Sequence, residues 1–136
     1  MRVNLLKLMD EAKCYEMLRE LRWEADVKCP RCHSDTITKN GHDAVHIYRQ
    51  RYYCQSCKRN FDDLTGTVFS GSNKSLKVWV VALYLMGLNL SNAQLAKELD
   101  VSEPTAQRMT RVLREGIVKK SLIYNLQMKL RQTKSI

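Results

Sequence analysis

The spacing of apolar residues changes twice along the 136-residue chain, and each change marks a different kind of secondary structure. Residues 8–23 show the period of an amphipathic helix, with Asp10 as its N-cap. Residues 27–62 lose that period and gain turn residues and residues that favour strands, whereas everything from Ser75 onward is helical again. The face of the first helix carries Cys14, Leu18 and Leu21. The pattern therefore predicts a helix, then strands, then further helices.

The β-rich stretch predicts a hairpin. The segments "TITK" (36–39) and "VHIYRQRYYC" (45–54) are expected to be its strands. Asn40-Gly41 lies between them and is a typical tight-turn dipeptide, so the chain is expected to reverse there. A connector rich in Gly, Ser and Thr, residues 64–73, separates the hairpin from the helices.

The helical half contains two well-marked helix starts. Ser91 and Gln94 have the spacing of a capping box, which predicts a helix over 92–99. Ser102 is expected to cap the next helix, and Asp100 in the intervening turn tolerates a left-handed backbone. The buried stripe of that next helix is expected to consist of Ala106, Met109, Leu113 and Ile117.

Four of the five cysteines form two C-x2-C pairs separated by 21 residues, Cys29 with Cys32 and Cys54 with Cys57. Zinc favours four ligands in a tetrahedron, so two such knuckles joined by a hairpin predict one structural Zn²⁺. A redox C-x-x-C would open a helix, whereas strands are expected to flank both pairs. Four thiolates leave no position for a catalytic water, so the metal is expected to hold the fold. His33 follows the first knuckle and is expected to be a left-handed turn residue rather than a ligand.

The charge of the chain changes the picture by favouring a polyanionic partner. There are 23 Lys and Arg residues against 14 Asp and Glu, which gives a formal net charge of +9. Nucleic acid is the first candidate and an acidic membrane surface the second. No signal peptide is visible, and the most apolar run, Val78 to Met86, is far too short for a membrane span. We therefore expect a cytoplasmic, DNA-associated protein with reduced cysteines and no membrane partner.

A basic second helix after a short turn is typical of a helix-turn-helix, with small Ala96 at the crossing; a plain helical bundle is the alternative. In the helix-turn-helix geometry the start of the second helix enters the major groove of double-stranded DNA. The residues expected to face base edges are Ser102, Glu103, Thr105, Gln107 and Arg108. Arg111 and Arg114 are expected to meet phosphate.

Basic and aromatic residues are also interleaved around the cysteines. The alternation in "YRQRYYC" predicts that they occupy opposite faces of a strand, one packed on the metal core and the other free to meet phosphate. A merely solvated face is the alternative. The candidate phosphate contacts of the ribbon are Arg49, Arg51, Lys58 and Arg59.

These elements predict a small α+β protein in which a β-rich zinc ribbon is followed by an all-α helix-turn-helix bundle. The expected segments are an N-terminal helix packing on the ribbon (1–26), the zinc ribbon (27–63), a connector (64–74), the helix-turn-helix domain (75–118) and a basic tail that is helical or frayed (119–136).

The motifs taken together resemble the N-terminal part of zinc-ribbon insertion-sequence transposases. The likeness covers roughly residues 8–116, through "ELRWEADVKCPRC", "RYYCQSCKRNFDDLTGTVF", "LKVWVVALYLM" and "RMTRVLRE". The resemblance implies that the ribbon and the helix-turn-helix bind transposon-end DNA. It also implies that a later RNase H-like domain, with an acidic triad and divalent metal, would cut and join strands.

The chain departs from that family in ways that bear on activity. From Pro104 onward the only acidic residue is Glu115, whereas two-metal strand transfer needs several carboxylates. We therefore expect no catalytic residues and no enzyme activity in this chain alone. His33 and Asp100 stand where the family commonly has glycine, and both positions tolerate the exchange.

The function expected from the sequence is DNA recognition within a transposase-like system. The alternatives are a truncated or split transposase that needs a separate catalytic subunit, and a stand-alone DNA-binding regulator. The tail carries an apolar stripe of Leu122, Leu126 and Leu130. It is expected to be either a self-association helix or the frayed end of an interrupted reading frame, and a single stripe of this length is marginal alone.

Overall fold

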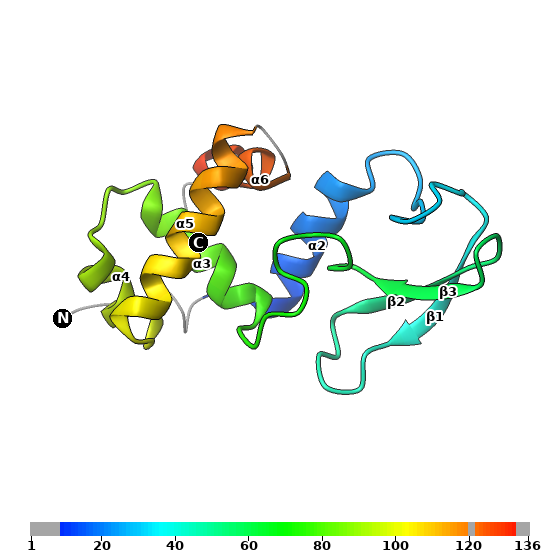
Figure 1. The fold of residues 1–136 in the computed structure, drawn as a ribbon, viewed down its shortest axis with the longest axis horizontal. Helices are drawn as coiled ribbons and strands as arrows, with labels where there is room; N and C mark the ends of the chain where they lie inside the picture. Colours follow the sequence, from blue (N-terminus) through cyan, green and yellow to red (C-terminus); the bar gives the residue numbers. More distant parts are fainter. Residues whose placement is uncertain (1–8, 120–121, 133–136) are drawn as a thin grey trace. The chain divides into compact units, whose positions relative to one another are not determined.

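The computed structural model describes residues 9–119 and 122–132. Their elements are α2 (Glu11–Arg22), β1 (Ile37–His42), β2 (Gln50–Cys54), β3 (Arg59–Asp62), α3 (Leu76–Met86), α4 (Asn92–Leu99), α5 (Glu103–Val118) and α6 (Leu122–Gln132), shown in Figure 1. The expected α+β class is confirmed. None of the helices in the described ranges is long and apolar enough to cross a membrane.

The chain divides into two compact units. One consists of residues 15–72 and contains the sheet, and the other joins the start of the chain to residues 73–136 and contains α3 to α6. The boundary falls within α2. Residues 1–8 of the expected N-terminal segment, and residues 120–121 and 133–136 of the expected tail, lie outside the described residues.

The sheet has three antiparallel strands in the order β1-β2-β3, so β2 is central. Tyr52 of β2 lies opposite Lys39 on one side and Phe61 on the other. Tyr52 and Cys54 lie on one face of β2 and are buried, whereas Arg51 lies on the opposite face and is exposed. This alternation follows from the two-residue period of a strand and turns one face of the sheet toward the core.

The expected turn at Asn40-Gly41 is wrong, because both residues lie inside β1. The pairing of β1 with β2 slips between Lys39 and His42, which is the signature of a β-bulge. Gly41 has φ +75°, a left-handed conformation that costs glycine little and that a bulge of this kind requires. The dipeptide therefore bends the strand without reversing it.

The hairpin reverses later, between Asp43 and Arg49, so the strand expected over 45–54 begins only at Gln50. The Asp43 carboxylate accepts hydrogen bonds from the backbone N–H groups of Val45 (3.0 Å) and His46 (2.8 Å). Such a side-chain turn competes with strand pairing and offers the backbone another set of partners. The loop is thus set by Asp43, and its apolar residues are left exposed.

The core beneath the sheet is aromatic. Trp23 meets both Tyr52 and Phe61 edge-on, with ring centroids 6.2 Å apart in each case, and Tyr52 stacks on Phe61 at 5.2 Å. Each such pair adds about 0.5–1.5 kcal/mol to what area burial contributes. Cys29 and Cys54 belong to the same buried cluster, so the aromatic core and the candidate metal centre are continuous.

The helix starts of the second unit follow the local sequence signals. Ser91 Oγ accepts from the Gln94 N–H (3.2 Å) and Gln94 Oε1 accepts from the Ser91 N–H (2.9 Å), which completes the expected capping box. Ser102 Oγ accepts from the Thr105 N–H at 3.3 Å. Asp100 has φ 56° in the turn between the helices, as expected. The predicted pair of capped helices is therefore confirmed.

The buried stripe of α5 differs from the expectation at its C-terminal end. Ala106, Met109 and Leu113 are buried as predicted, but Ile117 is only half-buried. Gly116 is buried in its place, because α6 packs there: a Cβ on Gly116 would lie 2.6 Å from Ile123 Cγ1. The absence of a side chain at this position permits the close approach of the two helices.

Helix α6 is packed into the helical unit, against α3 and α5. Its buried residues are Ile123, Leu126, Gln127 and Leu130. Residues 122–132 of the expected tail are thus helical, and their buried residues pack within the chain. The stripe is satisfied within the chain, which gives this short helix the tertiary contacts that it needs.

Candidate metal centre and nucleic-acid interface

The two cysteine pairs form knuckles of the same shape. In the first, the His33 N–H donates to the Cys29 carbonyl at 2.9 Å, and in the second the Lys58 N–H donates to the Cys54 carbonyl at 2.9 Å. His33 (φ 62°) and Lys58 (φ 61°) both adopt the left-handed conformation after the second cysteine of their pair. The expectation that His33 is a turn residue is confirmed. Lys58, expected at the DNA surface, holds the equivalent backbone position.

The four sulfurs lie within 4.8 Å of one another. Cys29 Sγ is 3.7 Å from Cys57 Sγ, and Cys32 Sγ is 3.5 Å from Cys54 Sγ. Zn–S bonds of about 2.3 Å in a tetrahedron separate the sulfurs by about 3.8 Å, whereas a disulfide would bring two of them to about 2.05 Å. The observed spacing and the all-thiolate donor set therefore fit Zn²⁺.

Backbone amides prepare the buried sulfurs for ionisation. The Arg31 N–H points to Cys29 Sγ (3.4 Å) and the Cys57 N–H to Cys54 Sγ (3.5 Å). Burial tends to raise the pKa of Cys29, but hydrogen bonds from backbone N–H groups and neighbouring thiols lower it to about 6. Burial and the three neighbouring cysteine side chains raise the pKa of Cys57 to about 12. Four adjacent thiolates repel one another, so a dication is needed to ionise them together.

Polar contacts tie the knuckles to each other and to the sheet. Ser34 Oγ and Ser56 Oγ, one from each knuckle, share a hydrogen bond of 2.7 Å. Arg31 Nη1 donates to the Asn60 carbonyl at 3.0 Å. The ligands are thus held by groups that belong to both halves of the site, an arrangement that orients metal ligands before the ion binds.

A buried carboxylate that sequence reasoning missed joins the sheet to α2. Asp63 is 1% exposed. Its Oδ2 accepts from Arg19 Nη1 (2.8 Å) and from the Gln50 N–H (2.9 Å), and its Oδ1 accepts from the Tyr52 hydroxyl (2.9 Å). Burial and the neighbouring Asp63 charge raise the pKa of Tyr52. The only signal in the sequence was an acidic residue just past a strand, which is too common to single out.

Arg22 extends this network to the connector. Its guanidinium donates to the carbonyls of Asp63 (2.6 Å) and Thr65 and lies 4.4 Å over the Trp23 ring. Burial lowers the pKa of Arg22, and the nearby Asp63 and Asp62 charges oppose that shift. One helix therefore fastens both the last strand and the segment that follows it.

The basic residues of the ribbon differ in availability. Arg51, Lys58 and Arg59 are exposed, whereas Arg49 is half-buried with its Nε donating to the Tyr15 hydroxyl at 3.0 Å. Arg51 and Tyr52 lie on opposite faces of β2 as expected, but Tyr53 shares the face of Arg51. The expected separation of basic from aromatic residues is thus incomplete.

The predicted contact residues of the helical unit gather at the start and along one side of α5. Ser102, Glu103, Gln107, Arg108, Arg111 and Arg114 are exposed, and Thr105 is half-buried. The hydroxyls of Ser102 and Thr105 lie 2.8 Å apart, and Arg108 Nη2 donates to Thr105 Oγ1 at 3.3 Å. The hydroxyls of Ser102 and Thr105 therefore form hydrogen bonds within the helix cap. The exposed side chains of Gln107, Arg111 and Arg114 form no such contacts among the described residues.

Comparison with known proteins adds a family to this geometry. Residues 9–60 match the transposase zinc-ribbon domain. An uncharacterized protein in transposable element ISH50 of Halobacterium salinarum is 39% identical over 108 residues, which make up 78% of this chain and 36% of that protein. The chain thus spans well under half of that relative. No solved structure matches the present chain.

The match and the geometry agree on the role of the cysteines. The matched range contains all of β1 and β2 and both knuckles, and its four sulfurs have the spacing of a closed zinc tetrahedron. Cys29, Cys32, Cys54 and Cys57 accordingly form the site of one structural zinc ion. Residues 9–60 of this chain are thus similar to a transposase zinc-ribbon domain in sequence, and their four cysteines have the geometry of its metal site.

Proposed function

We propose that the chain binds duplex DNA as the recognition part of a transposase-like system, with α5 reading bases in the major groove. One observation carries the proposal: α4 and α5 are capped helices joined by residues 100–102, and α5 presents an exposed polar and basic side. Two capped helices joined by so short a turn are typical of a helix-turn-helix, whose second helix enters the major groove. The net charge of +9 supports a polyanionic partner.

Different residues of α5 serve different parts of the contact. Gln107 and Arg108 lie in the first half of the helix, where Gln can bind adenine N6 and N7 and Arg can bind guanine O6 and N7. Arg111 and Arg114 lie further along and contact phosphate, which fixes register without reading sequence. Ser102 and Thr105 act through the cap that orients Arg108.

The zinc ribbon contributes backbone contacts. Arg51, Lys58 and Arg59 are exposed cations on or beside the sheet, and the metal keeps that small sheet in shape. Arg49 contributes less, since Tyr15 holds its guanidinium. The strand-cutting chemistry belongs to a separate catalytic domain or subunit, because a site closed by four thiolates has no position for a reacting water.

The proposal is tested by selecting bound sequences from a random duplex pool, with zinc content measured on the same sample. A defined site should emerge, and its affinity should fall steeply with salt. Gln107→Ala or Arg108→Ala should weaken binding to that site by about 1–3 kcal/mol and relax specificity at one base pair. Arg51→Gln should weaken binding to all sequences and lower the salt slope by about 0.9.

Lys13→Gln is the matched control, because it also removes one charge, from an exposed position on α2. It should change neither the selected site nor the specificity. Recovery of no preferred sequence by a zinc-loaded, folded chain would sink the proposed major-groove readout. Binding that is insensitive to moderate salt would equally contradict it.

A further inference from the structure

A cavity in the helical unit has the lining of an anion site. Its volume is about 420 Å³, and it lies where the turn after α3, the start of α4, α5 and α6 meet. The polar groups that line it include Asn89, Asn92, Arg114, Gln127 and Arg131, and its lining contains no carboxylate. A polar cavity with cationic and amide groups and no acid favours a negatively charged occupant.

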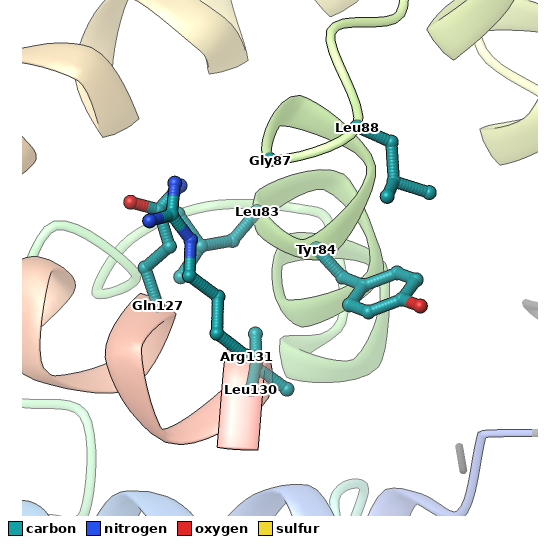
Figure 2. A pocket seen from close by; sticks show the side chains of 7 residues that line it. All are labelled: Leu83, Tyr84, Gly87, Leu88, Gln127, Leu130 and Arg131. Atoms are coloured by element: carbon teal, nitrogen blue, oxygen red, sulfur yellow. The ribbon is translucent and has the colours of Figure 1, made fainter. Parts of the chain in front are cut away.

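Gln127 is the residue that points to a ligand. Its side chain is 8% exposed, yet among the described residues it makes no hydrogen bond. Gln127 and Arg131 also line a smaller cavity of about 250 Å³, together with residues of α3 and the turn after it. Figure 2 shows the side chains around that cavity. Its carboxamide lines the cavity without a hydrogen-bond partner among the described residues, so its NH₂ group can donate to whatever enters.

The cations of the cavity are likewise unpaired within the described ranges. Neither Arg114 of α5 nor Arg131 of α6 has an ion-pair or hydrogen-bond partner there. Arg131 follows Gln127 by four residues, so the two lie on the same side of α6. Guanidinium groups bind phosphate with two parallel hydrogen bonds, which a carboxylate-free lining leaves them free to do.

The start of α4 supplies the remaining donors. Ser91 and Gln94 satisfy each other in the capping box, and the Asn92 Oδ1 accepts from the Thr110 hydroxyl at 3.2 Å. That contact turns the Asn92 carbonyl oxygen inward to the protein and leaves its NH₂ group as a donor. The N-terminus of α4 adds the positive end of its helix dipole.

We propose that this cavity binds a phosphate group, held by Arg114, Gln127, Arg131 and the start of α4, and that the group is a backbone phosphodiester of the bound duplex. The source of the phosphate rests on the proposed function, whereas the chemistry of the cavity stands apart from it. Helix α6 thereby becomes part of the DNA-binding surface, beside the helix that reads bases.

The first arm of the test uses inorganic phosphate and the zinc-loaded full chain. In a ¹H–¹⁵N spectrum, phosphate should shift the side-chain NH₂ signals of Gln127 and Asn92 saturably, whereas sodium chloride at equal ionic strength should not. Gln127→Glu keeps the shape of the side chain and replaces a donor by a carboxylate. It should weaken phosphate binding at least about tenfold. Lys13→Gln, which removes a charge on α2, should leave the titration unchanged.

The second arm measures duplex binding against salt. Arg131→Gln should lower the slope of log K against log salt by about 0.9, the change expected for one lost phosphate contact. Lys13→Gln should leave the slope as in the wild type. Thermal unfolding of each variant shows that the helical unit is intact, and Gln127→Glu provides a second substitution if Arg131→Gln fails to fold.

The outcomes separate the cavity from the proposed function. Saturable phosphate shifts together with the lowered slope support the inference. If the chain binds duplex but phosphate has no saturable effect and the slope is unchanged, the inference is overturned while the proposed function stands. Phosphate shifts with an unchanged slope overturn the DNA source. Phosphate shifts in a chain that binds no duplex overturn the proposed function and leave the anion site in place.

Discussion

Cys14 is the one cysteine outside the zinc cluster, and it is fully buried. Burial raises its pKa to about 12; Glu11 and Asp10 add to the increase and Lys77 opposes it. At neutral pH it is therefore a thiol, and a thiol is neither a good metal ligand nor a good nucleophile. Its position makes it a small core residue of the helical unit.

The raised pKa of Cys14 predicts a loss of stability in alkali. Above a pH of about 8.5 the unfolded chain gives up this proton while the folded chain keeps it. The stability is thus fully present below that pH and declines, by at most about 1.4 kcal/mol per pH unit, as pH rises toward 12. Urea unfolding of zinc-loaded protein between pH 8 and 10 measures it. Cys14→Ala should flatten the slope; an identical slope in both proteins would contradict the argument.

Gly116 makes a second prediction at this scale. Alanine would normally stabilise a helix interior by up to about 1 kcal/mol, but here its Cβ would fall 2.7 Å from Ile123 Cβ. Gly116→Ala should therefore lower the free energy of unfolding by about 1–3 kcal/mol. Equilibrium urea unfolding gives the value. Ile123→Ala removes the Cγ1 atom, which would lie 2.6 Å from the new Cβ, and keeps the Ile123 Cβ, so it should relieve part of the cost of Gly116→Ala. Strictly additive effects of the two substitutions would argue against the contact.

At the scale of elements, α2 is fastened to the sheet through Asp63. Asp63→Asn replaces one carboxylate oxygen by an NH₂ group and removes the ion pair with Arg19. The side chain then has one acceptor oxygen left, so either the Tyr52 hydroxyl or the Gln50 N–H loses its partner. The cost should be about 1–3 kcal/mol. Asp26→Asn changes an exposed carboxylate and should stay within about 0.5 kcal/mol of the wild type. Equal melting temperatures for all three proteins would refute a structural role for Asp63.

The elements set by local signals were predictable from the sequence. The helix of 92–99 begins and ends where expected, since capping and periodicity depend on residues a few positions apart. The zinc ligands were predictable for a similar reason, because their spacing alone defines the site.

Features that depend on distant partners were not predictable. Asn40-Gly41 has the composition of a turn, and only pairing with β2 makes it a bulge. Asp63 needs Arg19, 44 positions earlier, to become an anchor. Likewise, the stripe of α6 looks unsatisfied until Gly116 provides space on α5. In each case tertiary contacts decide between conformations that the local sequence allows.

At the scale of the whole molecule, the two units should respond differently to loss of metal. The ribbon is too small to bury enough apolar surface for stability, and zinc contributes on the order of 10 kcal/mol to such modules. Chelation with EDTA should therefore collapse the amide signals of residues 50–62 toward those of a disordered chain. The signals of residues 92–118 should remain dispersed, because none of the four zinc-binding cysteines lies in that unit.

Two cysteine variants calibrate this experiment. Cys54→Ser should abolish the bound zinc and reproduce the effect of EDTA, whereas Cys14→Ala should retain one zinc per chain. A colorimetric zinc assay gives the stoichiometry. Persistence of the ribbon signals after complete zinc removal would mean that the aromatic core and the Asp63 network suffice to hold it.

The four ligands of the zinc ion do not share one environment. Cys29 and Cys54 are buried, Cys57 is half-buried and Cys32 is exposed. Ligand exchange and oxidation act on a sulfur that reagents can reach, so both should begin at Cys32, even though the ion is tightly bound at equilibrium. The rate at which the ribbon loses zinc should therefore depend on the accessibility of Cys32, one corner of the tetrahedron. A thiol-rich competitor or an oxidant that reacts there would begin the unfolding of the ribbon.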